Sequence, residues 1–410
     1  MARTMKRAVT SEELSAPVTP YQDALREVLS AFRPLPPVVT PLRDALGLVC
    51  AETVTADHDV PPFPSSAMDG YAIHAADTAG ATAEKPAVLT LAGDIPAGTS
   101  SEEIVQRGTA TKIMTGAPLP PGADAIVPWE DTQPRDGEIA VLVAVPERKH
   151  VRPQGEDVPA GTPVIPQGAM LGPVHLGVLA SLGRAGVKAH PRPRVAVLST
   201  GDELVEAGKP LGPGQIHESN AVLIAALLDR AGAAPGDVAM IGDDPDAIAA
   251  WLKKSATSHD LIVTTGGASV GEHDWMREVL TRDGELKMWR VAIKPGKPIA
   301  FGSIGGTPVF GLPGNPGSAF VGMHVFVGAA VRVLSGRDTD PAHTTMKLAT
   351  GVKGSPSRTL FCRVRIEGDT AVPLPAQSSV VLSNLLPTEA FAVVPPGGLP
   401  AGAPVRVEPL

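Results

Sequence analysis

The sequence has 410 residues, enough for two or three domains, and its 43% hydrophobic content is enough for sizeable cores. Aromatic residues make up only 3% and the formal net charge is −8, which argues against the stacking surfaces and basic faces of nucleic-acid-binding proteins. The two cysteines provide neither a disulfide framework nor a four-ligand metal set, and they favour a reducing cytoplasm.

The N-terminal part of the chain predicts a flexible tail, a helix and then a small β-domain. Residues 1–19 lack the apolar segment of a signal peptide. From Tyr21 apolar residues recur at helical spacing until Pro34. Short β-type runs separated by Gly, Pro and Asp then follow at 87–91, 109–114, 125–128 and 139–145.

After Pro193 the sequence alternates between strands and helices, which predicts a doubly wound α/β domain with a largely parallel sheet. Strands are expected at 194–199, 238–241, 260–264, 288–293, 298–301 and 308–310, and helices at 221–231, 246–254, 274–280 and 317–334. The last helix is short and carries His324 and Arg332, so it predicts a core helix and not a membrane span. From Asp338 onward, further β-type runs predict a second β-domain.

The loops that leave these strands share a charged, glycine-rich composition. Ligands of open α/β sheets bind at the carboxyl ends of the strands, so these loops should form one rim. They comprise residues 199–203 (STGDE), 242–244 (GDD), 264–274 (TTGGASVGEHD), 294–298 (KPGKP) and 311–316 (GLPGNP). The rim would combine three acids (Glu203, Asp243, Asp274), three cations (Arg290, Lys294, Lys297) and bare glycine backbone.

This combination predicts a metal-assisted phosphoryl or nucleotidyl reaction. Glycine backbone can approach an anion closely, lysines neutralise oxyanions, and carboxylates bind Mg²⁺ while leaving positions for water and substrate. The spacings match neither the dinucleotide-binding fingerprint nor the phosphate loop of nucleoside triphosphatases.

Each loop taken alone also has a structural interpretation. A lone Gly-Gly or Asp-Asp after a strand is usually turn chemistry, and Lys294 and Lys297 could be solvated turn residues. Asp202 is best interpreted as a turn or capping residue. The histidines are scattered without a two-histidine helical spacing, which argues against a zinc site. The proline-rich loop at 61–71 is, on local chemistry, only a well-formed loop.

Taken together and in order, the motifs resemble those of the molybdopterin molybdotransferases, the MoeA family, which includes the C-terminal domain of gephyrin. The matching segments are 66–71 (SAMDGY), 114–117 (MTGA), 151–152 (VR), 155–157 (GED), 199–203 (STGDE), 214–216 (GQI) with Asn220, 266–271 (GGASVG) with Asp274, 294–298 (KPGKP) and 311–316 (GLPGNP). The resemblance extends over residues 21–410.

The resemblance implies an α/β multidomain fold of four parts after the tail. These are a discontinuous linker domain (20–60 and 157–190), an inserted β-domain (61–156), an α/β molybdopterin-binding domain like the molybdopterin adenylyltransferases (191–337) and a C-terminal β-barrel (338–410). It also implies an elongated homodimer with its site at the subunit interface. Asp69, Thr115 and Asp157 would then act across that interface as catalytic residues.

The implied reaction inserts molybdate into adenylylated molybdopterin, with a divalent metal such as Mg²⁺, and releases AMP. Glu203, Asp243 and Asp274 match the family's acidic site residues, with a role in metal binding or in positioning the substrate. Residues expected to bind substrate or oxyanion are Lys294, Lys297, Arg290, Gly266, Gly267, Ser269, Gly314, Asn315, Arg358, Ser378 and Ser379. Arg290 stands where many members have lysine, and Pro64-Ser65 replaces a frequent Asp-Asn pair.

Two other functions compete with this one. A molybdopterin adenylyltransferase would use the same α/β core, but a free-standing one lacks the β-domain that carries Asp69, Thr115 and Asp157. A non-catalytic scaffold of the gephyrin kind would not need Lys294, Lys297 or Asp274. The expected partners are a molybdopterin adenylyltransferase and cofactor-accepting molybdoenzymes, with no role for nucleic acid or membrane.

Overall fold

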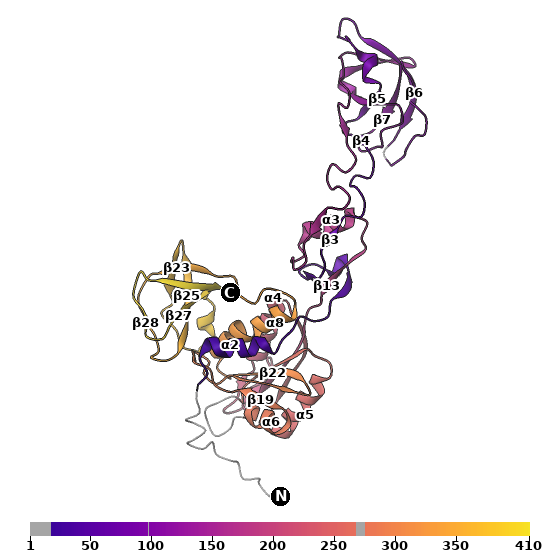
Figure 1. The fold of residues 1–410 in the computed structure, drawn as a ribbon. Helices are drawn as coiled ribbons and strands as arrows, with labels where there is room; N and C mark the ends of the chain where they lie inside the picture. The colour runs from indigo at the N-terminus through magenta and orange to yellow at the C-terminus, as the bar shows by residue number, and fades with distance from the viewer. Residues whose placement is uncertain (1–17, 97, 268–274) are drawn as a thin grey trace. The chain divides into compact units, whose positions relative to one another are not determined.

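The computed structural model describes residues 18–96, 98–267 and 275–410 (Figure 1). The chain forms two compact units, one made of Met1–Val39, Gly47–Ala51 and Lys188–Leu410 and the other of Thr40–Leu46 and Glu52–Val187. The predicted division into a linker, an inserted β-domain, an α/β domain and a barrel is finer than this and stays a prediction.

The unit formed by residues 40–46 and 52–187 is built on a six-stranded sheet. Its spatial order is β8-β5-β7-β6-β10-β9, with β6 and β7 parallel and the other neighbours antiparallel. The strands are β5 (Gly70–Ile73), β6 (Ala87–Ile95), β7 (Thr109–Ile113), β8 (Ala125–Pro128), β9 (Thr132–Arg135) and β10 (Glu138–Val141). The four β-type runs of the sequence are thus confirmed as strands, although the last one ends at Val141. Leu89 and Val127 of these strands form one core with Ile73 of β5.

Short elements complete this unit. Two small antiparallel pairs join β4 to β11 and β3 to β12. The elements are β3 (Val54–Thr55), β4 (Ser65–Ser66), β11 (Val151–Arg152), β12 (Pro163–Ile165), helix α3 (Pro173–Ser181) and the 3₁₀ turns η1 (Leu42–Asp44), η2 (Ala75–Thr78) and η3 (Trp129–Asp131). The chain passes between the two units in β1 (Val38–Pro41), β2 (Val49–Cys50) and β13 (Gly186–His190).

The other unit contains the predicted α/β domain, whose sheet has the order β17-β14-β18-β22-β21-β19. The first four strands are parallel, and β21 and β19 are antiparallel to their neighbours. The strands are β14 (Arg194–Thr200), β17 (Ala234–Ile241), β18 (Leu261–Thr265), β19 (Glu285–Met288), β21 (Ala300–Ile304) and β22 (Thr307–Leu312), beside the small pair β15 (Leu204–Val205) and β16 (Ile216–His217). The single strand expected at 288–293 is wrong, because the chain there divides into β19 and β20 (Ile293–Lys294), which join different sheets.

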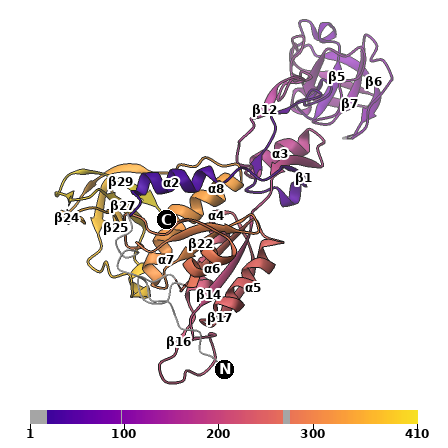
Figure 2. The same cartoon turned by 60° about the horizontal axis from the view of Figure 1, so that its bottom comes forward.

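Helices cover both faces of this sheet, as the doubly wound prediction requires (Figure 2). Alternate residues of β14 point to opposite sides, so Val195 and Val197 join one core while Ala196 and Leu198 join the other. The first core contains α2 (Tyr21–Ser30), α4 (Asn220–Ala231), α7 (Pro316–Gly322) and α8 (Gly328–Leu334). The second contains α5 (Pro245–Ala256) and α6 (Trp275–Asp283).

The apolar stretch expected to be a core helix forms α7, the π-helical turn η4 (Met323–Val327) and α8 in continuity. By length and composition Pro316–Leu334 could cross a membrane, but 89% of its most apolar window is buried inside the protein. The interpretation as a core helix is therefore confirmed, because its apolar faces already pack against the sheet, α2 and α4.

The C-terminal region forms a closed five-stranded barrel, drawn in yellow in Figure 1. Its order is β25-β26-β23-β29-β27, and pairing of β25 with β27 closes it. The strands are β23 (Thr344–Leu348), β25 (Thr359–Glu367), β26 (Thr370–Pro373), β27 (Ala390–Val394) and β29 (Pro404–Pro409), with β24 (Val352–Lys353), β28 (Gly398–Leu399) and the 3₁₀ turn η5 (Leu382–Leu385) outside it. β20 adds in parallel to β25, so the barrel and the α/β domain share hydrogen-bonded backbone.

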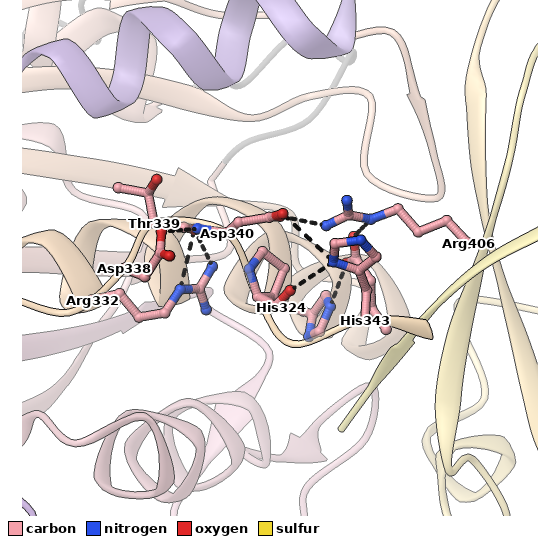
Figure 3. Close-up of polar contacts among 9 residues, drawn as sticks. His324, Arg332, Asp338, Thr339, Asp340, His343 and Arg406 are labelled. Atoms are coloured by element: carbon pink, nitrogen blue, oxygen red, sulfur yellow. Dashed lines mark hydrogen bonds and ion pairs between the residues drawn. The ribbon is translucent and has the colours of Figure 1, made fainter. Parts of the chain in front are cut away.

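A polar cluster fixes the barrel to the long core helix (Figure 3). Glu408 is 3% exposed, and its carboxylate contacts His324 Nε2 at 2.9 Å and Arg406 Nε at 2.7 Å. Arg406 also contacts Asp340, which lies 3.5 Å from His343. Burial acts to raise the pKa of Glu408, but the hydrogen bonds from His324 and Arg406 outweigh burial and hold it below the usual value.

Glu408→Gln should therefore lower the free energy of unfolding at pH 7 by about 2 kcal/mol, because it removes the buried carboxylate charge that accepts hydrogen bonds from Arg406 and His324. A carboxyl whose pKa is depressed in the folded state stabilises the protein above its unfolded pKa and loses that effect as the pH falls through the folded pKa. The difference from wild type, measured by urea unfolding, should shrink below about pH 4.5.

Glu367→Gln is the matched control, since Glu367 also pairs with an arginine on the barrel but is exposed. Its effect should stay below about 1 kcal/mol. Equal effects of the two substitutions at pH 7 would contradict the stabilising role of the buried pair.

Candidate functional site

The register of the α/β sheet brings the predicted loops to one edge. Thr200 pairs with Ile241, Ser199 with Thr265, and Thr265 with Leu312, so β14, β17, β18 and β22 end level with one another. Ala300, at the start of the antiparallel β21, pairs with Gly311. The loops that follow the four parallel strands therefore begin at one edge of the sheet, and segment 294–299 ends at that edge, where it enters β21. This edge is the rim.

Two of the three predicted acids lie on adjacent loops of the rim. Glu203 is exposed and its carboxylate folds over Gly201, where an added Cβ would lie 2.6 Å from Oε2. Asp243 is half-buried, and its backbone N–H donates to Asp202 Oδ1 at 2.9 Å. Asp202 thus links the first two loops of the rim through a hydrogen bond. Asp274 lies outside the described residues.

The predicted acids at this edge have the carboxylate chemistry that Mg²⁺ prefers. Mg²⁺ binds through one or two carboxylates and completes its octahedron with water and substrate oxygens, and Glu203 and Asp243 supply such carboxylates. Among the described residues there is no group of three or more His, Cys, Asp or Glu side chains placed to hold a metal, so a third protein ligand would have to come from elsewhere.

The glycines of the third loop allow backbone to approach backbone. Gly266 and Gly267 have φ values of +84° and +61°. A Cβ on Gly266 would lie 2.1 Å from the carbonyl oxygen of Thr200, a distance that excludes any side chain. Gly314 also lies close, since its Cβ would contact Gly266 Cα at 3.7 Å. Ser269, predicted on the same loop, lies outside the described residues.

Asn220 ties this loop to the Gly-Leu-Pro-Gly-Asn loop, a role that the sequence did not predict. Its Nδ2 donates to Thr265 Oγ1 at 3.0 Å and to the carbonyl oxygen of Gly314 at 2.7 Å, while the Thr265 hydroxyl donates to the Pro313 carbonyl at 3.2 Å. Asn220 Oδ1 is buried without a hydrogen-bond partner in the part of the chain described. Asn315, on the same loop, is exposed and precedes α7.

The predicted cations differ in their exposure. Lys294 is exposed and Lys297 is half-buried, on either side of Gly296, which has φ +101°. Arg290 is 3% exposed and its guanidinium lies 4.1 Å from the centre of the Trp289 ring. The lysines are therefore accessible to a ligand at the rim, whereas Arg290 is a buried residue stacked on an aromatic ring.

The barrel residues predicted to face substrate lie beside this edge. Ile293 pairs with Thr359, so Lys294 in β20 lies beside the strand that Arg358 precedes. Arg358 Nε contacts Ser355 Oγ at 3.3 Å. The carbonyl oxygen of Ser379 accepts from the backbone N–H of Gly317, at the first turn of α7, at 2.9 Å.

In the other unit the structure joins Asp69 to Thr115. Asp69 Oδ1 accepts from the backbone N–H of Thr115 at 2.7 Å and from its hydroxyl at 2.8 Å. The backbone hydrogen bond and then the hydroxyl lower the pKa of Asp69, so this carboxylate is ionised at neutral pH. Gly116, at φ +83°, allows the turn that follows Thr115.

Asp157 is exposed on a neighbouring loop of the same unit. Asp59, which the sequence did not predict as a site residue, organises this loop. Asp59 accepts from the side chain of Gln154 and from the backbone N–H of Ala160, both at 2.7 Å. These hydrogen bonds close the loop on either side of Asp157 and lower the pKa of Asp59. The sequence signal, an aspartate before the Pro-Pro-Phe-Pro segment, is too common to identify this role.

A cavity of about 230 Å³ lies in the unit that holds the α/β domain and the barrel, but away from the predicted residues. It is lined by Leu227, Arg230, Ala231, Phe320, Met323, His324, Gly328, Arg332, Pro341, Ala342, Pro409 and Leu410. None of the residues predicted for the site is among them, so this cavity does not identify the site.

Comparisons with known proteins agree over most of the chain. Family models match residues 19–183 (MoeA N-terminal region, domain I and II), 196–332 (probable molybdopterin binding domain) and 345–410 (MoeA C-terminal region, domain IV). Molybdopterin molybdenumtransferase 2 of Mycobacterium tuberculosis (strain H37Rv) is 43% identical over 325 residues, which are 78% of this chain and 80% of the relative.

Two further relatives cover more of the chain. The molybdopterin molybdenumtransferase of Haemophilus influenzae is 36% identical over 378 residues, 90% of this chain and 92% of its own length. A crystal structure of the molybdopterin biosynthesis protein MoeA from Pyrococcus horikoshii matches with a TM-score of 0.82 and 32% identity, covering 96% of this chain and 99% of that one. The chain belongs to the MoeA family of molybdopterin molybdenumtransferases.

Proposed function

We propose that this protein inserts molybdate into adenylylated molybdopterin and releases AMP, as the last step of molybdenum cofactor biosynthesis. The single observation that carries the proposal is the register that gathers acids, lysines and glycine backbone at one edge of the sheet. Relatives named molybdopterin molybdenumtransferase supply the substrate class. A cytoplasmic location fits the soluble substrates.

The residues divide into those that hold anions and those that hold a metal. Lys294 and Lys297 would neutralise the molybdate oxygens and the pyrophosphate-like link, and the glycine loops offer backbone N–H groups to the same anions. Glu203 and Asp243, with Asp274, would hold a divalent metal such as Mg²⁺, which when bound neutralises charge on the transferring phosphoryl group.

The chemistry requires one bond to break at phosphorus. An oxygen of molybdate, or of water, attacks the adenylyl phosphorus, and the bond between that phosphorus and the bridging oxygen of the molybdopterin phosphate breaks. If the attacking oxygen comes from molybdate, its Mo–O bond breaks as AMP leaves with that oxygen, and the two dithiolene thiols lose their protons and bind the molybdenum, which stays Mo(VI). If the attacking oxygen comes from water, AMP leaves with it, and the two thiols displace oxygen ligands of molybdate, which leave as water with the thiol protons. Arg358, Ser378 and Ser379 of the barrel would orient the oxyanion during this step.

We further propose that the protein acts as a homodimer in which each site takes residues from both subunits. Asp69, Thr115 and Asp157 of one subunit would contact the substrate bound to the α/β domain of the partner. The Asp69 and Thr115 contacts hold an ionised carboxylate on a defined loop, as a residue acting on a ligand requires. A molybdopterin adenylyltransferase would supply the substrate, and molybdoenzymes would accept the product.

Turnover of adenylylated molybdopterin, followed by AMP release and cofactor formation with molybdate and Mg²⁺, tests the function. Lys297→Met should lower turnover by about 10²-fold, because it removes a cation from the oxyanion site. Lys287→Met is the control, since Lys287 pairs with Glu285 on β19 and has no part in the rim. Consumption of ATP would indicate the adenylyltransferase instead, and binding without turnover would indicate a scaffold.

Gly266→Ala should lower turnover at least about tenfold, because a Cβ there collides with the Thr200 carbonyl and displaces the loop. Gly306→Ala is a matched control, since Gly306 has φ +83° but nothing within 4 Å of an added Cβ. The positive φ alone costs each variant about 1 kcal/mol, and the collision at Gly266 adds a further loss of stability that thermal unfolding measures. Equal turnover of the two variants would rule out a role for the close approach at Gly266.

Mixing two inactive variants tests the shared site. Asp69→Asn and Lys297→Met each spoil both sites of their own homodimer, but a mixed dimer has one site with both residues intact. Unfolding and refolding the variants together should restore about a quarter of wild-type turnover, as random pairing of subunits predicts. Refolding each variant alone is the control. No recovery in mixed dimers, detected by two affinity tags, would place both residues in one subunit's site.

A further inference from the structure

A buried arginine on the outer face of the barrel strand β25 holds the segment that carries Ser378 and Ser379. Arg363 lies on β25 and is 4% exposed. Its Nη2 donates to the carbonyl oxygens of Ala376 at 2.6 Å and Ser378 at 3.0 Å. Burial lowers the pKa of Arg363, yet an arginine remains charged at neutral pH, so both are charge-assisted hydrogen bonds.

Gln377 holds the same segment by binding the backbone of Arg363. Its hydrogen bonds and those of the Arg363 side chain are together called the clamp. The backbone N–H of Arg363 donates to Gln377 Oε1 at 3.0 Å, and Gln377 Nε2 donates to the carbonyl oxygens of Arg363 at 2.9 Å and Leu374 at 2.8 Å. The ladder between β25 and β26 pairs residues as far as Pro373, and one further backbone hydrogen bond runs from the N–H of Leu374 to the carbonyl oxygen of Arg363 at 2.9 Å. Side-chain hydrogen bonds therefore take over from the ladder where segment 374–379 leaves the sheet.

The clamped segment ends against the rim. The backbone N–H of Gly317 donates to the carbonyl oxygen of Ser379 at 2.9 Å. A Cβ on Gly317 would lie 2.9 Å from Ser379 Cα, so only glycine permits this approach. Gly317 lies two residues after Asn315, so a displacement of segment 374–379 changes what faces the Gly-Leu-Pro-Gly-Asn loop.

We propose that Arg363 is a positioning residue for the oxyanion side of the site: through the carbonyls of Ala376 and Ser378 it sets where Ser378 and Ser379 meet the start of α7. The consequence for molybdate rests on the proposed function, whereas the positioning itself does not. A buried charge suits this task, because its donors are satisfied only by the fixed carbonyl groups around it. Arg363 Nη1 is buried without a hydrogen-bond partner within the described chain, so the carbonyls of segment 374–379 are the main compensation for its burial.

Arg363→Met tests the proposal with two independent measurements. Amide hydrogen exchange, followed by mass spectrometry on peptides that contain Gly317, should become at least about tenfold faster, because the acceptor of that N–H is no longer fixed. Exchange in β27 and β29 should stay unchanged. With molybdate as the varied substrate, KM should rise at least about tenfold while kcat changes less than about threefold.

Arg365→Met is the matched control, because Arg365 lies on the same strand but is exposed and pairs with Glu367. Arg363→Lys keeps the charge, so its Gly317 exchange rate and its KM for molybdate should lie closer to wild type than those of Arg363→Met. Gln377→Leu removes only the hydrogen bonds of the Gln377 amide. This variant replaces Arg363→Met in the experiment if Arg363→Met does not fold. The Gly317 amide of Gln377→Leu should also exchange faster than in wild type.

Two results would overturn the proposal. One is unchanged exchange at Gly317 in Arg363→Met and Gln377→Leu, and the other is faster exchange across the whole barrel, which would mean that Arg363 only stabilises the fold. Faster exchange confined to Gly317 with unchanged KM for molybdate would overturn the link to the oxyanion. Absence of turnover in wild type would count against the proposed function, and the exchange data would still decide the positioning.

Discussion

The level ends of four parallel strands are the constraint on which the candidate site depends. Parallel pairing of β14 with β17 and β18, and of β18 with β22, sends every following loop out from one edge. Residues more than a hundred positions apart in the sequence, such as Glu203 and Asn315, therefore emerge from the same edge of one sheet without any direct pairing between them. The antiparallel β21 extends the rim, because the lysine segment enters it at the edge where β22 ends.

The barrel can contribute to this rim because it shares both backbone and core with the α/β domain. β20 adds to β25, and Tyr21 lies edge-on to Phe326 of the core helix and to Phe361 of the barrel. Tyr21 is also close enough to Glu408 that burial, and then this carboxylate, raise its pKa to about 12. Aromatic packing and a buried ion pair thus join the two parts at several points, and a loop of the barrel is held firmly where it meets α7.

The sequence predicts those features that repeat locally and misses those that depend on distant partners. Strand and helix periodicity identifies the α/β domain and the β-runs, and the chemistry of the strand-end loops follows from the topology. The division at 288–293 was missed because β20 has two residues and pairs with a strand more than sixty residues later. The roles of Asn220 and Asp59 were missed for the same reason, since a single Asn or Asp has no local pattern that names its acceptor or donor.

Buried and exposed charges have different tasks in this protein. Glu408 and Arg363 are almost fully buried, and each holds an element in place through fixed hydrogen bonds, because an unpaired charge inside the protein would cost too much free energy. Glu203 and Lys294 are exposed at the rim, where water satisfies them until a ligand arrives. Buried charges such as Glu408 and Arg363, which no ligand can reach, thus fix the positions of the elements around them. The exposed charges at the rim are left to exchange water for substrate.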